Sequence, residues 1–117
     1  MTDTRQPRVS DLRVVLITAP DGAVAKRIAE TLVGEGLAAC VNLLPGISSV
    51  YRWHGSLERA EETLLIAKTT AALVDSLEKR LGEVHPYEVP ECIALEPTNA
   101  APAYLRWVLE ETGGKSA

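Results

Sequence analysis

Three short apolar runs, at residues 14–17, 64–67 and 92–95, constrain the fold of this chain more than any other feature. Each run has the length of a β-strand, and neighbouring residues of a strand point to opposite faces of a sheet. Because every residue in these runs is apolar, both faces of the predicted sheet carry apolar side chains. A sheet with helices on one face and water on the other would show alternation instead.

The face that the helices leave open would be a large apolar patch, which monomers seldom expose. Two arrangements can cover it. A C-terminal helix can fold across the face, or copies of the chain can form a cyclic oligomer that buries the face and pairs the sheet edges. We predict an obligate homo-oligomer and keep the helix as the alternative.

Helical periodicity separates the strands. Apolar stripes occur at Val24, Ile28 and Leu32, then at Leu73, Leu77, Leu81 and Val84, and a last helix starts near Pro102 and ends before Gly113. The resulting order, βαββαβα, predicts an α+β fold, a ferredoxin-like βαββαβ sandwich with an added C-terminal helix. We expect a single domain over residues 1–117, with residues 1–11 and 113–117 as loose termini.

A hairpin is predicted in the middle of the chain. The extended stretch "LAACVNLLPGISSVYRWHG" should bend or bulge near Pro45 and Gly46, and His54 with Gly55 should form the turn to the strand in "EETLLIAKTT". Thr69 or Thr70 is expected to cap the following helix.

Cys40 and Cys92 are expected to be free thiols. In the usual arrangement of this fold, the second and fourth strands are the two edges, which places the cysteines three strand spacings apart, ~14 Å. That exceeds the ~7 Å limit between the α-carbons of a disulfide.

The charge balance argues against nucleic acid as a partner. The chain has 12 basic and 16 acidic residues, a formal net charge of −4, and no cluster of lysine and arginine. No stretch approaches the ~20 apolar residues that span a bilayer, and the first ten residues are polar. We therefore expect no membrane segment and a cytoplasmic protein.

The segment "HPYEVPEC", residues 85–92, holds one histidine and one cysteine of the chain. Pro86 and Pro90 each disfavour helical geometry in the residue before them, so the segment is first a stiff, extended connector.

Metal ligation is a second hypothesis for parts of this segment. His85 can be a ligand or a hydrogen-bonding residue at a helix end, and Cys40 a soft-metal ligand or a buried thiol. A carboxylate beside His85 would complete a site, and the candidates are Glu58, Glu61, Glu62, Glu88 and Glu91. No local metal motif is present, so such a site needs tertiary or quaternary contacts.

The aromatic residues indicate a pocket or an interface. Tyr51 and Trp53 share a strand face with Ser49, and Tyr87 lies in the connector. Lys68 could supply a positive charge to this pocket, or could be an ordinary exposed strand end. Tyr104 and Trp107 are expected to be the packing surface of the last helix.

Catalysis is not expected. An acylphosphatase of this element order needs a basic loop around phosphate, whereas the first loop here is "APDG". No serine or cysteine has a base placed beside it by local sequence.

Taken together, "TAPDG", "LAACVNLLPGISSVYRWHG", "EETLLIAKTT" and "HPYEVPE" resemble the CutA divalent-cation tolerance family over residues 13–111. The resemblance implies a homotrimer of ferredoxin-like subunits, a role in tolerance of copper and other divalent ions, and no organic cofactor. The resemblance also implies that the family's motif residues gather near a cleft between subunits. By position, the motif residues in this sequence are Cys40, Tyr51, Trp53, Glu62, Lys68, His85, Tyr87, Pro90 and Glu91. This chain has Ile17 and Val84 where some relatives carry a cysteine and a second histidine.

The resemblance thus implies metal ligands at Cys40, His85, Glu62 and Glu91, and a ligand cleft at Tyr51, Trp53, Lys68, Tyr87 and Pro90. Its implied partners are further copies of the chain and divalent metal ions, copper among them. The alternative is a trimeric signalling module similar to the PII proteins, with a small anionic ligand in the cleft. A scaffold for another protein is a third hypothesis.

Overall fold

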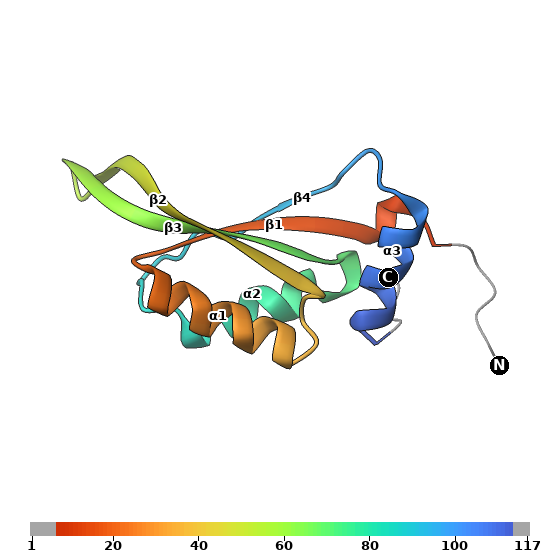
Figure 1. Cartoon of the computed structure of the whole chain (residues 1–117). Helices are drawn as coiled ribbons and strands as arrows, with labels where there is room; N and C mark the ends of the chain where they lie inside the picture. Colours follow the sequence, from red (N-terminus) through yellow and green to blue (C-terminus); the bar gives the residue numbers. More distant parts are fainter. Residues whose placement is uncertain (1–6, 114–117) are drawn as a thin grey trace.

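The structure is a computed structural model that describes residues 7–113. Its elements follow the predicted order βαββαβα, with two short 3-10 turns added (Figure 1). They are η1 (Val9–Asp11), β1 (Leu12–Ala19), α1 (Gly22–Gly34), β2 (Cys40–Trp53), β3 (Ser56–Thr70), η2 (Ala71–Leu73), α2 (Val74–Val84), β4 (Ile93–Leu95) and α3 (Pro102–Glu111).

The four strands form one antiparallel sheet in the order β2-β3-β1-β4, so β2 and β4 are the edges. Helices α1 and α2 lie together on one face of the sheet (Figure 1). Cys40 begins β2, Cys92 directly precedes β4, and both thiols are free, as expected.

The core lies between the sheet and helices α1 and α2. Alternate residues of β1, Val15 and Ile17, are fully buried there, together with Ile28 of α1 and Leu77 of α2. Helix α1 begins after Asp21, whose carboxylate accepts a hydrogen bond from the backbone N–H of Val24 at 2.9 Å. This cap satisfies one of the unpaired donors at the start of the helix.

The opposite sheet face is apolar and largely uncovered. Val14 pairs with Leu95, and Leu16 with Ile93, so these four side chains share that face. Ile93 is 49% exposed and Leu95 is 46% exposed. The predicted apolar face is therefore present on the single chain.

Helix α3 covers only one end of the molecule. It packs Leu105, Val108 and Leu109 against Leu12 and Ala39 in a cluster separate from the main core. Figure 1 shows α3 beside the end of the sheet rather than across its length. The last helix thus covers the end of the open face near Leu12 and leaves Ile93 and Leu95 exposed, so the alternative explanation holds only for part of that face.

The β2–β3 hairpin extends past the helices as an exposed arm (Figure 1). The strand register shifts between Leu44 and Ile47, which confirms the predicted bulge, and Gly46 there has φ 74°. His54 and Gly55 have φ of 48° and 82°, and two positive φ values in a two-residue turn are the geometry of type I′.

Four details differ from the sequence predictions. Helix α3 packs through Leu105, Val108 and Leu109, whereas Tyr104 and Trp107, the expected packing surface, are each 39% exposed. The fourth strand has only three residues, Ile93–Leu95. Thr70 does not cap the following helix, and the Thr69 hydroxyl instead donates to the carbonyl of Leu37 at 2.6 Å. Part of the terminus that was expected to be loose, Val9–Asp11, forms a 3-10 turn. Within that prediction, residues 1–6 and 114–117 lie outside the described residues.

Candidate functional site

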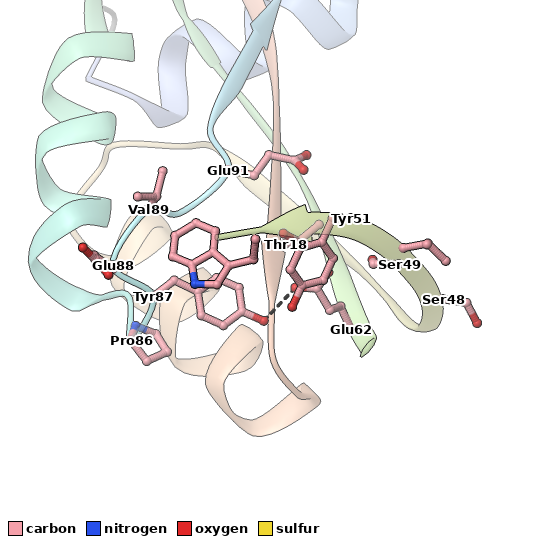
Figure 2. A pocket seen from close by; sticks show the side chains of 12 residues that line it. Thr18, Ser48, Ser49, Tyr51, Glu62, Pro86, Tyr87, Glu88, Val89 and Glu91 are labelled. Carbon is pink, nitrogen blue, oxygen red and sulfur yellow. Dashed lines mark hydrogen bonds between the residues drawn. The ribbon is translucent and has the colours of Figure 1, made fainter. Parts of the chain in front are cut away.

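A pocket of about 780 Å³ lies between the hairpin arm and the connector that follows α2 (Figure 2). Its volume falls within the range of about 300–1,000 Å³ typical of small-molecule sites. The residues that line it are Thr18, Ser48, Ser49, Val50, Tyr51, Trp53, Glu62, Pro86, Tyr87, Glu88, Val89 and Glu91.

Strand pairing places one half of the pocket. Tyr51 pairs with Glu58, and Trp53 pairs with Ser56. Ile47 lies an even number of residues before both, so it points to the same face of the strand, and it pairs with Glu62. Cross-strand partners point to the same face, so the two aromatic rings and the Glu62 side chain lie on one face of the hairpin.

The connector supplies the other half, and His85 holds it in place. Helix α2 ends at His85, whose ψ of 137° is extended, as expected for a residue before proline. The His85 ring is buried, and its Nε2 donates to the backbone carbonyl of Thr18 at 2.7 Å. Because Nε2 carries the proton, Nδ1 is free to accept, and it receives the backbone N–H of Tyr87 at 3.1 Å.

Tyr87 connects the two halves. Its hydroxyl donates to Oε2 of Glu62 at 2.6 Å, the hydrogen bond drawn in Figure 2. Burial of the ring raises the pKa of Tyr87 well above its usual value, and the hydrogen bond to Glu62 and the charge of that carboxylate raise the pKa further. Tyr87 therefore remains a donor at neutral pH, and Glu62 accepts a short, charge-assisted hydrogen bond.

The predicted metal ligands do not converge in one chain. Cys40 pairs with Lys68 on the sheet, and its sulfur lies 4.0 Å from the side-chain oxygen of Asn42. Lys68 and Glu62 belong to the same strand and are separated by ~20 Å at ~3.3 Å per residue. Glu62 and Glu91 line the pocket, and His85 supports it, whereas Cys40 and Lys68 lie at the other end of the sheet.

Two further observations bear on metal binding. Within residues 7–113, no group of three or more histidine, cysteine, aspartate or glutamate side chains is close enough together to hold a metal ion. Both ring nitrogens of His85 are already engaged in hydrogen bonds, so a metal ion would have to displace one of them.

The remaining candidate residues divide between the two ends of the sheet. Tyr51, Trp53 and Tyr87 do come together, as predicted, and Pro90 is half-buried beside the pocket without lining it. Sequence reasoning did not name Thr18 as a site residue. Its contribution includes a backbone carbonyl, which no side-chain pattern reveals.

The thiols differ in their surroundings. Burial raises the pKa of Cys92, and the charges of Glu78 and Glu91 raise it further. Near Cys40, burial raises the pKa of Tyr104, with a smaller contribution from the thiol.

The fold and the pocket together define a small α+β protein with an acidic and aromatic pocket beside a long hairpin. The family model described as "CutA1 divalent ion tolerance protein" matches residues 13–111. The chain belongs to this family.

Relatives and solved structures agree with this assignment. The divalent-cation tolerance protein CutA of Thermus thermophilus is 48% identical over 100 residues, which cover 86% of this chain and 97% of that protein. Mouse protein CutA is 47% identical over 96 residues, 82% of this chain, although the matched region is only 54% of the mouse protein.

Among solved structures, the divalent cation tolerance protein of Thermus thermophilus superposes with a TM-score of 0.85 at 47% identity, over 87% of this chain and 99% of that one. CutA from Xylella fastidiosa gives a TM-score of 0.85 at 42% identity, over 87% and 98%. In the described part of the chain, no helix is both long enough and apolar enough to cross a membrane.

Proposed function

We propose that this protein takes part in the tolerance of divalent cations in the cytoplasm, as a homotrimer that binds copper or another divalent ion and catalyses no reaction. The family match over residues 13–111 carries the proposal. The family description and the names of relatives specify tolerance and no reaction, which supports a role without catalysis.

The open apolar face supports self-association. Ile93 and Leu95 leave an apolar surface in water that an oligomer would bury, at a gain of roughly 25 cal/mol per Å² of apolar area. Both sheet edges, β2 and β4, lack a neighbouring strand in the described chain and are available to pair with another copy. A closed trimer is the proposed assembly, with ferredoxin-like subunits.

The proposed metal site needs more than one subunit. Cys40, His85, Glu62 and Glu91 are the proposed ligands, and this set does not fit a metal ion within one chain, because Cys40 lies at the far end of the sheet from Glu62. Thiolate and imidazole suit copper, and carboxylates suit harder divalent ions. The proposal therefore places the site where Cys40 of one subunit meets the pocket of the next.

Titration of the purified protein with copper and with zinc, by calorimetry and by native mass spectrometry, tests this proposal. We expect a mass of three chains and saturation at one metal per subunit or per trimer. Cys40→Ala and Glu62→Gln should abolish saturation, and Cys92→Ala, the matched control at the other cysteine, should not. Weak uptake that does not saturate, unchanged by these substitutions, would contradict direct metal binding.

A second candidate function is small-ligand signalling from the cleft, as in the trimeric PII proteins. The observation that favours it is the pocket itself, whose volume suits an organic molecule better than a bare ion. Lys68, the proposed partner for an anionic ligand, is not among the residues that line the pocket.

A further inference from the structure

The charges of the pocket restrict what it can hold. Three glutamates are among the residues that line it, Glu62, Glu88 and Glu91. Of the described residues that line it, none is a lysine, an arginine or a histidine. In a single chain, an anionic ligand would therefore meet negative charge here and no positive counter-charge from the lining residues.

Glu62 is the carboxylate least accessible to water. The residue is only 9% exposed, and its hydrogen bond comes from Tyr87, a neutral donor. Within residues 7–113, no basic side chain lies within ion-pair distance of Glu62. A buried carboxylate loses much of its hydration, so a cation beside it would be bound more strongly than on an open surface.

Aromatic rings supply the second half of the recognition. Tyr51, Trp53 and Tyr87 all line the same pocket, and ring faces attract cations that have given up part of their water. Alkyl groups also pack well on such rings. This combination suits a ligand with both a positive charge and a hydrocarbon part.

We propose that the pocket binds an organic ammonium ion, with its charged group on Glu62 and its alkyl part against the three aromatic rings. The ammonium N–H groups donate to the carboxylate oxygen that Tyr87 leaves free. His85 is a positioning residue, because it fixes the backbone of Tyr87 and so the direction of the Tyr87 hydroxyl. The proposal rests on the pocket of one chain and uses Glu62, which is also a proposed metal ligand, so a metal ion and an ammonium ion would compete for this carboxylate.

The chain contains a natural reporter. Only two tryptophans are present, and Trp107 lies in α3, so a Trp107→Phe variant of the full chain leaves Trp53 in the pocket as the sole source of indole fluorescence. Butylammonium, butan-1-ol and butyrate are suitable probes, because they share one alkyl chain and carry a positive, a neutral and a negative head group.

We expect butylammonium to change Trp53 fluorescence with saturation, at an affinity about tenfold or more above those of butan-1-ol and butyrate, because the alcohol lacks the positive charge and butyrate carries the same charge as Glu62. Equal affinity for the three probes, or tighter binding of butyrate, in the protein with Glu62 intact would overturn the proposal, whatever happens to the variants.

Glu62→Gln keeps the shape of the side chain and removes its charge, so it should weaken butylammonium binding by about tenfold or more and leave butan-1-ol unchanged. Glu61→Gln is the matched control. Glu61 is the adjacent residue on β3, is exposed, does not line the pocket, and carries the same charge.

If Glu61→Gln weakened binding as much as Glu62→Gln, attraction to the acidic surface would explain the result and the proposal would fall. Saturable copper binding that butylammonium does not displace, combined with no fluorescence response to butylammonium, would also overturn it. That outcome would leave the proposed role in metal tolerance standing.

Discussion

At the scale of single residues, His85 determines the shape of the connector. Its ring accepts from Tyr87 on one side and donates to Thr18 on the other, so the segment after α2 is tied to the end of β1. A buried imidazole with both nitrogens satisfied is stable in one tautomer. The ring thereby places Tyr87 within reach of Glu62.

Tyr87→Phe should lower the free energy of unfolding by about 1–3 kcal/mol at pH 7, because the buried Glu62 carboxylate loses its donor. Urea unfolding monitored by circular dichroism measures the change. Equal stability of variant and wild type would contradict the importance of this hydrogen bond.

The stability of the wild type should also depend on Tyr87 in alkaline solution. The folded pKa of Tyr87 lies above the ordinary value of 10.0. Its contribution is therefore fully present below pH 10, and it is lost as pH rises toward the folded pKa, because the unfolded chain releases the proton first. Tyr87→Phe should make the fall in stability above pH 10 less steep in denaturant titrations. An unchanged slope would show that Tyr87 does not titrate differently in the two states.

Cys92 should be a slow nucleophile. Burial and the charges of Glu78 and Glu91 raise its pKa, so little thiolate forms at pH 8. In a Cys40→Ser background, iodoacetamide should alkylate native Cys92 more slowly than the same chain unfolded in urea, as followed by mass spectrometry. Glu91→Gln should increase the native rate modestly, and equal rates in native and unfolded chains would contradict the prediction.

Sequence reasoning found the aromatic residues of the pocket but not their distance from Cys40 and Lys68. Tyr51 and Trp53 were recognisable because alternation along one strand fixes a shared face. The separation of Lys68 from Glu62 depends on the length and register of β3, which local composition does not determine. The His85 contact with a backbone carbonyl had no signal in the sequence at all.

At the scale of elements, backbone conformation decides what a glycine contributes. Gly55 in the hairpin turn has φ 82°, whereas Gly82 lies inside helix α2. A Cβ atom added at either position would meet nothing within 4 Å. Both positions therefore have room for a methyl group, and the backbone angle φ distinguishes them.

Alanine at these two positions should have effects of opposite sign. Gly55→Ala should destabilise the protein by about 1–2 kcal/mol, because an L-residue is strained at positive φ. Gly82→Ala should stabilise it by about 0.5–1 kcal/mol, because alanine favours the helix. Thermal unfolding of both variants tests this, and changes of the same sign would refute the explanation.

The turn at His54–Gly55 was predictable, because these two residues form a short polar break between two strands. The helix caps were not: the Asp21 cap of α1 was not named from the sequence, and the expected threonine cap of α2 is absent. The length of the fourth strand was overestimated, because the apolar run also includes Cys92, which does not pair with β1. Apolar composition predicts burial, whereas strand length depends on the partner strand.

At the scale of the whole molecule, the uncovered sheet face is the largest departure from a self-sufficient monomer. Leu95→Asp should dissociate the proposed trimer and lower its melting temperature, because an unpaired charge would enter the interface. Val33→Asp is the matched control, since Val33 is 42% exposed on α1 and Leu95 is 46% exposed on the open face. Light scattering should show one chain for the first variant and three for the second. An unchanged mass for Leu95→Asp would place the interface elsewhere.

The pairing of β1 with β4 joins residues near the two ends of the domain, Val14–Leu16 to Ile93–Leu95, and this has a consequence for synthesis on the ribosome. Translation proceeds at about 5–20 residues per second, so the ~80 residues between the two strands take roughly 4–16 s to make. During that interval the nascent chain carries one apolar strand edge without its neighbour. Slow translation of the last third of the message would prolong this exposure and favour aggregation before the subunit is complete.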